Sequence, residues 1–93
     1  MSPVRASLHY VYVLRSIKNG RLYTGYTSDL RKRLEEHKEK RKRYTTYSGP
    51  YELVYYEACR DLTDAQAREK YLKSGMGKRY LKNRNKRFLA LTG

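Results

Sequence analysis

Cysteine, long apolar runs and acidic side chains are all scarce in this chain of 93 residues. The single cysteine, Cys59, excludes an internal disulfide and a cysteine-rich metal site. No apolar run is long enough for a transmembrane helix, and no apolar stretch near Met1 reads as a signal peptide. We therefore expect a cytoplasmic protein of a reducing compartment, with no membrane partner.

The shortage of acidic residues leaves a large positive charge. Nine Asp and Glu face 22 Lys and Arg, so the formal net charge is +13 and the isoelectric point is near 10.0. Such a field attracts polyanions, and nucleic acid is the first candidate because neutralising its phosphates releases counterions. An anionic membrane surface is the weaker alternative. Charge alone does not distinguish a nuclease from a non-catalytic binder or an RNA-bound protein of ribosomal type.

The residue pattern predicts one α+β domain spanning residues 1–93. A chain of this length supports a single modest core. Runs rich in β-branched and aromatic residues predict three strands, and apolar residues at helical spacing predict three helices. The result is a small three-stranded antiparallel sheet flanked by helices, in the order β-β-α-β-α-α. We expect strands over 8–14, 22–27 and 51–59, helices over about 29–40, 63–74 and 78–91, and a core within about 8–74.

Local signals predict where the helices begin and what they bury. Ser28 is the expected N-cap of the first helix, with Asp29 at the positive end of its dipole. Thr63 and Gln66 match the spacing of a capping box for the second helix. The last helix is very basic and carries a stripe suited to burial on one face. Its members are Tyr80, Leu81, Phe88 and Leu91.

Glu69 occupies an unusual position for a carboxylate. On a helical period it shares a face with Leu62, Ala65 and Leu72. A carboxylate that faces a core is costly unless it is paired or bound to a metal. The sequence leaves two alternatives open, a buried ion pair with one of the arginines or a metal ligand.

The first hairpin places Tyr12 and Tyr23 on one face of the sheet, together with Gly25. A two-residue turn at Asn19-Gly20 would set Tyr12 opposite Thr27, with the two tyrosines roughly 13 Å apart along the strands. A wider turn or a β-bulge would bring them closer, and the sequence does not decide between these registers. Glycine weakens a strand unless another group must approach closely.

The first helix carries Arg33 and His37 four residues apart, on one face. Arginine suits bidentate contact with phosphate, and a neutral histidine can relay a proton near pH 7. Taken alone, such a pair is commonplace on a helix surface. The cations that follow would normally be read as a solvated helix end. They include Lys38, Arg41, Lys42 and Arg43.

Together these residues resemble the GIY-YIG endonuclease superfamily, in particular the small stand-alone bacterial members related to the incision domain of an excision-repair nuclease. Tyr10-Val11-Tyr12 corresponds to the first half-motif, although Tyr10 replaces its glycine. Tyr23-Thr24-Gly25 corresponds to the second half. Arg33 and His37 stand at the family's spacing, and Glu69 matches its metal-binding glutamate. The resemblance covers residues 9 to about 74.

This resemblance implies a metal-dependent endonuclease that hydrolyses DNA phosphodiester bonds. Glu69 would hold one Mg²⁺ or Mn²⁺, and Tyr12 would act as general base on the attacking water. Its proton would pass to His37 or to a hydroxide on the ion, and its pKa, ordinarily near 10, would have to be lowered. Arg33 would clamp the phosphate, and Tyr23 would orient water or phosphate.

The expected substrate is DNA, branched or damaged, in preference to RNA, and the expected process is repair or recombination. Flanking phosphates would contact Lys38, Arg41, Lys42 and Arg43. Such contacts confer affinity but no sequence specificity. The main alternative is a non-catalytic DNA- or RNA-binding protein that keeps the fold. The candidate catalytic residues favour the nuclease over this alternative.

Overall fold

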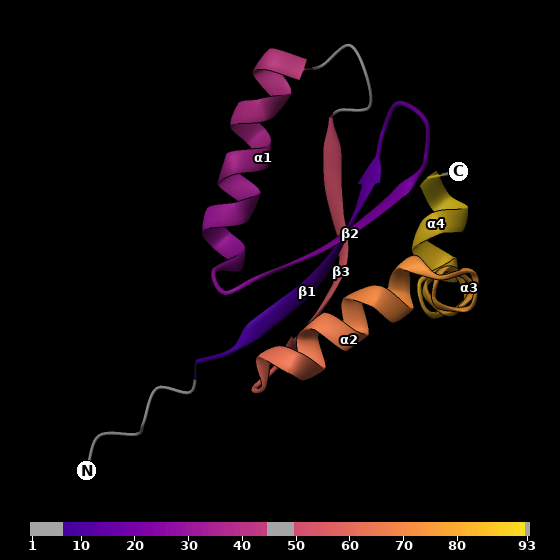
Figure 1. The fold of residues 1–93 in the computed structure, drawn as a ribbon. Helices are drawn as coiled ribbons and strands as arrows, with labels where there is room; N and C mark the ends of the chain where they lie inside the picture. Colours follow the sequence, from indigo (N-terminus) through magenta and orange to yellow (C-terminus); the bar gives the residue numbers. More distant parts are fainter. Residues whose placement is uncertain (1–6, 45–49, 93) are drawn as a thin grey trace.

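Three antiparallel strands form the centre of the molecule, and helices lie against both faces (Figure 1). The computed structural model describes residues 7–44 and 50–92, with the side chains of residues 7–37 and 50–90. The predicted α+β class is confirmed. The elements are β1 (His9–Ser16), β2 (Leu22–Thr27), α1 (Leu30–Tyr44), β3 (Tyr51–Cys59), α2 (Leu62–Lys73), α3 (Gly75–Arg84) and α4 (Lys86–Thr92).

The central strand β1 separates two differently packed faces. Strand order is β2-β1-β3, so β1 pairs on both sides. Alternate residues of a strand point to opposite faces. Val11 and Val13 point to the face covered by α2 and α3, where the core is completed. Burying such side chains contributes about 1.5–3 kcal/mol each. Their fully buried partners are Ala65, Leu72 and Leu81.

The hairpin register differs from the one expected for a two-residue turn. Tyr12 lies opposite Gly25 rather than Thr27. The connection spans residues 17–21, and only Gly20, at φ 74°, adopts a positive φ within it. The wider turn slides β2 along β1 by two residues relative to the expected register and places Tyr23 opposite Leu14. As a result the two tyrosines are diagonal neighbours on one face, at a typical separation of about 7–8 Å.

Two helix starts also differ from those predicted. The carboxylate of Asp29, not Ser28, accepts the Lys32 N–H at 3.0 Å, so Asp29 caps α1. The carboxylate of Asp61 accepts the N–H of Thr63 at 2.7 Å and caps α2 in place of the expected capping box. Aspartate competes well for this position because its carboxylate also favours the positive end of the helix dipole.

The basic C-terminal segment forms two helices rather than one over 78–91. The chain leaves α3 at Asn85, whose side-chain amide donates to the carbonyl of Leu81 at 3.0 Å. Leu81 is buried as predicted, but Phe88 is 39% exposed. The expected stripe is therefore wrong at Phe88, and the side chain of Leu91 lies outside the described part of the chain. Within residues 7–44 and 50–92, no helix has the length and apolar content to cross a membrane.

Candidate active site

Tyr12 and Gly25 lie directly opposite each other on β1 and β2, and the side chain of Tyr12 covers the glycine. A Cβ atom on Gly25 would lie 2.7 Å from the phenol oxygen. That distance is too short for a stable contact, so glycine is required for the observed position of the phenol. Tyr12 is only 6% exposed. The close approach predicted at Gly25 is thus made by Tyr12 itself.

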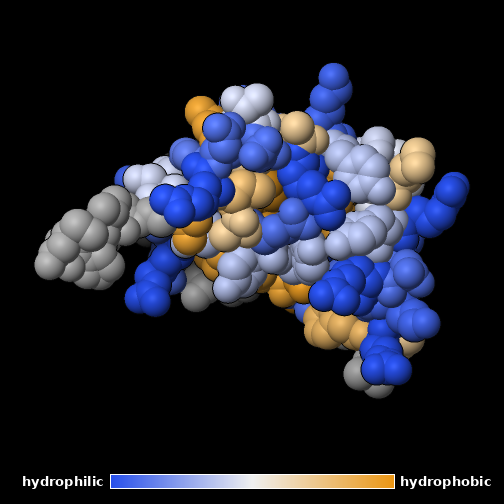
Figure 2. All heavy atoms as spheres, turned by 90° about the horizontal axis from the view of Figure 1, so that it is seen from below, coloured by the Kyte–Doolittle hydropathy of each residue, from blue (hydrophilic) through white to orange (hydrophobic). Residues whose placement is uncertain are grey.

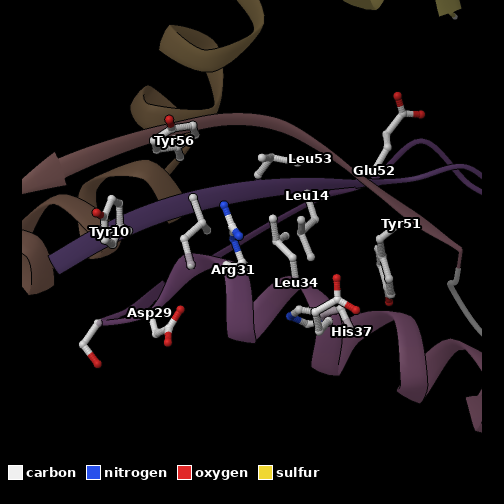
Figure 3. A pocket seen from close by; sticks show the side chains of 13 residues that line it. Tyr10, Leu14, Asp29, Arg31, Leu34, His37, Tyr51, Glu52, Leu53 and Tyr56 are labelled. Carbon is white, nitrogen blue, oxygen red and sulfur yellow. The ribbon is translucent and has the colours of Figure 1, made fainter. Parts of the chain in front are cut away.

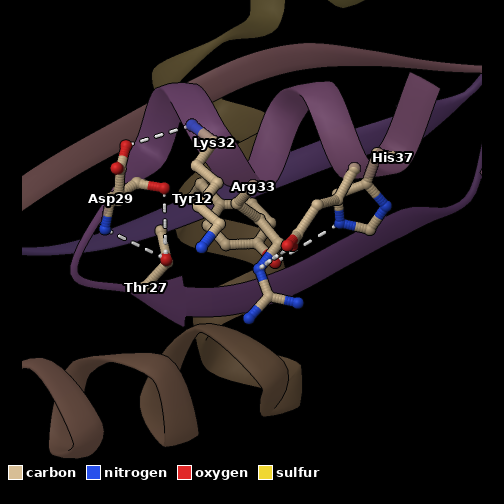
Figure 4. Close-up of polar contacts among 7 residues, drawn as sticks. Tyr12, Thr27, Asp29, Lys32, Arg33 and His37 are labelled. Atoms are coloured by element: carbon tan, nitrogen blue, oxygen red, sulfur yellow. Dashed lines mark hydrogen bonds and ion pairs between the residues drawn. The ribbon is translucent and has the colours of Figure 1, made fainter. Parts of the chain in front are cut away.

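His37 of α1 reaches the phenol of Tyr12 (Figure 4). Oη of Tyr12 and Nε2 of His37 are 3.5 Å apart, at the outer limit of a hydrogen bond. The rings of His37 and Tyr51 are 6.1 Å apart, and those of Tyr51 and Tyr23 are 5.3 Å apart. Tyr51 therefore joins the two motif tyrosines through an edge-to-face series of rings. Nothing in the sequence indicated this role, because it depends on the pairing of β3 with β1.

Arg33 lies one turn before His37 on α1, and its guanidinium extends past Tyr12 toward α2 (Figure 4). Its Nε is 3.6 Å from a carboxylate oxygen of Glu36, an exposed i,i+3 ion pair. The side chain of Arg33 is 39% exposed. This arrangement leaves the guanidinium accessible to an anion that approaches the Tyr12 phenol.

Glu69 projects from α2, and its side chain is only 20% exposed. Ala65 and Leu72 on the same face are fully buried, as expected, whereas Leu62 is 42% exposed and does not belong to the core. An oxygen of Glu69 lies 2.8 Å from Nζ of Lys73, one turn later. The Lys73 side chain is 56% exposed. The carboxylate is thus paired with an exposed lysine rather than with an arginine.

Charges from two helices, α1 and α2, act on the Tyr12 phenol. Burial raises its pKa above the ordinary value, Arg33 and Lys73 lower it, and Glu69 and Glu36 raise it. In this state the phenol is protonated at neutral pH. Arg33 of α1 and Glu69 of α2 therefore both lie close enough to Tyr12 to act on its phenol electrostatically.

The donor set of this site is one that magnesium accepts. Mg²⁺ retains several waters and binds one or two carboxylates together with substrate phosphates. Glu69 supplies one hard carboxylate oxygen at the edge of the site. Among the side chains of residues 7–37 and 50–90, no group of three or more His, Cys, Asp or Glu gathers as a metal site. Any ion here therefore depends on Glu69 and on ligands from water and substrate.

A hollow of about 700 Å³ borders the site between α1 and the sheet (Figure 3). The side chains of Leu14, Leu34 and Leu53 form its apolar part. His37 and Tyr51 line it as well and so contribute to both the ring series and the hollow. Because α1 carries few apolar residues, it does not fill this space against the sheet.

A second polar cluster fixes α2 against β3. Arg68 donates from Nε and Nη2 to the two carboxylate oxygens of Glu57 at 2.8 and 3.0 Å. The phenol of Tyr55 donates to the same carboxylate at 2.7 Å. The guanidinium also stacks over Tyr71 and Tyr80, at 5.1 and 4.9 Å from the ring centroids. Arg68 directly precedes Glu69, so this cluster orients the segment that carries the site carboxylate.

The structure brings some of the sequence-predicted site residues together and leaves others apart. Tyr12, Arg33, His37 and Glu69 converge, whereas Tyr23 is joined to them only through Tyr51 and is 38% exposed. The proposed phosphate contacts belong to the helix α1, but their side chains lie outside the described part of the chain. They are Lys38, Arg41, Lys42 and Arg43.

The sequence of this chain is similar to those of known proteins. The family model of the GIY-YIG catalytic domain matches residues 8–87. A UPF0213 protein of Clostridium perfringens is 42% identical over 67 residues, which cover 71% of each chain. A UPF0213 protein of Staphylococcus saprophyticus is 36% identical over 75 residues, covering 80% of this chain and 90% of that protein.

A solved structure shares the arrangement of the elements. The solution NMR structure of a UPF0213 protein from Bacillus halodurans superimposes with a TM-score of 0.51 at 36% sequence identity. The match covers 80% of this chain and 81% of that one. The sheet and helices are therefore shared with a small protein of similar sequence.

Proposed function

Because the chain belongs to the GIY-YIG catalytic domain family, which implies nuclease chemistry on nucleic acid, we propose that it is a divalent-metal-dependent endonuclease acting on DNA. The observation that carries this proposal is the convergence on Tyr12. His37 lies within 3.5 Å of its phenol, and the charges of Arg33 and Glu69 both act on it. A buried phenol flanked by an imidazole, a guanidinium and a carboxylate is suited to proton transfer at a phosphate.

Each side chain has a distinct task under this proposal. Oη of Tyr12 takes a proton from the attacking water after its own proton has been relayed by Nε2 of His37 to solvent. Arg33 binds two non-bridging phosphate oxygens and offsets the charge that develops on them. Tyr23 orients water or phosphate from the rim. Glu69 would hold the divalent ion, and Lys73, whose Nζ lies 2.8 Å from its carboxylate, would have to give way.

A divalent ion at Glu69 would supply positive charge that stabilises the phosphate oxygens and offsets the Glu69 charge that keeps Tyr12 protonated. Because the pKa of Tyr12 is raised, added positive charge is needed to balance the effects that keep the phenol neutral. Without added positive charge, burial and two carboxylates favour the neutral phenol. The expected dependence on Mg²⁺ or Mn²⁺ follows from this balance.

The direct test is nicking of supercoiled plasmid by the purified protein, with Mg²⁺, with Mn²⁺ and with EDTA. Glu69→Gln keeps the shape of the side chain but removes its charge, so it should abolish nicking while DNA binding stays nearly intact. Arg33→Ala should reduce nicking far more than binding. Nicking by Glu69→Gln at the parent rate would remove Glu69 from the mechanism.

A parent protein that binds DNA but never nicks it with either metal would contradict the nuclease proposal and favour the non-catalytic binder. The substrate panel should include duplex, nicked, branched and single-stranded DNA, so that any preference among these forms is measured. A role in repair or recombination would be supported by preference for the branched or nicked forms.

A further inference from the structure

The positive charge is distributed very unevenly along the chain. All nine acidic residues precede Lys70, whereas eight of the 22 Lys and Arg follow Glu69. No Asp or Glu occurs from Lys70 onward. More than half of the net charge of +13 therefore comes from the last quarter of the sequence. This charge lies on the end of α2, on α3 and at the start of α4.

The cations of this segment are exposed. Apart from Lys73, which pairs with Glu69, none makes a salt bridge with a carboxylate of residues 7–37 or 50–90. Figure 2 views the molecule from below Figure 1, and strongly hydrophilic side chains project from its rim. We name this set the C-terminal basic surface. Its members are Lys70, Lys78, Arg79, Lys82, Arg84, Lys86 and Arg87.

Helix stability accounts for the positions of only some of these charges. Lys70, Lys82 and Arg84 lie in last turns, where cations favour the helix dipole. Lys86 and Arg87 begin α4, where positive charge is unfavourable, and neither α3 nor α4 has an acidic residue in its first turn. A polyanionic partner would offset the repulsion between these cations and the positive start of the helix.

On α3 three of the four cations share one flank, whereas Arg84 lies on the other side of the helix. Lys78 and Lys82 are one turn apart, and Arg79 lies beside them. The other flank holds Leu81, which is 1% exposed and packs in the core. The basic flank is thus held by a buried anchor. Rigid presentation of several cations along a helix suits the regularly spaced phosphates of a nucleic-acid strand.

We propose that the C-terminal basic surface binds the phosphate backbone of the DNA that is cut at Tyr12. This inference rests on the proposed function for the identity of the substrate. The surface adjoins the site through α2, because Lys73 acts on both Glu69 and the Tyr12 phenol, and α3 begins two residues later. DNA leaving the site past Lys73 would continue along α3 and the start of α4.

The test measures binding without cutting, in EDTA and in the Glu69→Gln background. Anisotropy of a short labelled DNA duplex gives the affinity at several salt concentrations. Lys78→Gln/Lys82→Gln should weaken binding and reduce the slope of log affinity against log salt by about 0.9 for each lost phosphate contact. The matched control, Arg21→Gln/Arg60→Gln, removes two exposed charges from the ends of the sheet. It should leave the slope nearly unchanged.

A third variant separates binding from folding. Lys86→Gln/Arg87→Gln removes positive charge from a helix start, so thermal stability should hold or rise while DNA binding weakens. Equal slopes for all three pairs would overturn the proposed surface and indicate attraction by net charge alone. Binding of an RNA duplex but not of DNA would overturn the proposal that DNA is the substrate. Since no step requires cleavage, a failure of nuclease activity would be recognised separately in the plasmid assay.

Discussion

The phenol of Tyr12 lies over Gly25, so close that a single added methyl group would meet the phenol oxygen at 2.7 Å. The glycine of the second half-motif and the tyrosine of the first are therefore one structural unit. The unit depends on a hairpin turn that is wider than Asn19-Gly20 alone would give.

Replacing Gly25 with alanine should displace the Tyr12 phenol and reduce DNA cleavage at least about tenfold, because misplacement of a reacting group by about 1 Å is costly. DNA binding should be retained. The matched control is Gly20→Ala, at a position with φ 74° and no atom within 4 Å of the added Cβ. That variant should lose about 1 kcal/mol of unfolding free energy through backbone strain but keep its cleavage rate per folded molecule. Comparable catalytic losses in the two variants would contradict this account.

The cleavage rate should rise with pH across the range from about 6 to 9 because the proposed base is the ionised form of Tyr12. Burial raises the pKa of this phenol, so only a small fraction is ionised at neutral pH and that fraction increases as pH rises. The measurement is the single-turnover rate under saturating Mg²⁺. Tyr12→Phe should abolish cleavage, and Tyr23→Phe should lower the rate while preserving its pH dependence. A parent rate independent of pH would exclude Tyr12 as the base.

Lys73 should compete with the metal for Glu69, since its Nζ is 2.8 Å from the carboxylate. Lys73→Gln should therefore lower the Mg²⁺ concentration that gives half-maximal nicking by several-fold, as expected when a competing charge is removed. Lys70→Gln removes the same charge from the same turn of α2 without touching Glu69 and serves as the control. Identical metal dependence in the two variants would show that Lys73 does not guard the carboxylate.

Glu57→Gln should lower the free energy of unfolding by about 2 kcal/mol near neutral pH, because it breaks the charge-assisted bonds from Arg68. Burial raises the pKa of Glu57, but the hydrogen bonds from Arg68 and Tyr55 and the Arg68 charge outweigh it and hold the pKa below 4.5. The stabilisation is therefore complete above pH 4.5 and disappears as pH falls through the lowered pKa. Urea unfolding of parent and variant at pH 7 and at about pH 3 would show the difference shrink. A difference that persists unchanged in acid would rule out the ion pair as its source.

The sequence predicted the elements because they rest on local patterns. The strands around Tyr12 and Tyr23 and the inward face of Glu69 followed from periodicity and turn chemistry. The register did not, because the length of the turn is set by contacts such as the N–H of Ile17 donating to the carbonyl of Pro50 at 2.9 Å. Ile17 follows β1 and Pro50 precedes β3, so the two residues are far apart in the sequence and no local signal joins them.

The parts of the site that the sequence did not predict depend on long-range packing. Tyr51 completes the ring series only because the start of β3 pairs with the end of β1 at Ser16, beyond a register shift at Val13 and Leu14. An ion pair with an arginine was one of the two alternatives left open for Glu69, but Arg68 is held by Glu57 on the sheet side, and Glu69 pairs with Lys73. Sequence periodicity places a side chain on a face but does not choose its partner.

The most direct test of one metal-dependent site around Tyr12 is the paramagnetic broadening of NMR signals by substoichiometric Mn²⁺. The account predicts that signals of Tyr12, His37 and the turn of α2 around Glu69 broaden first, and that Glu69→Gln abolishes this selective effect. Broadening that is unchanged in Glu69→Gln, or that spares Tyr12 and His37, would contradict it.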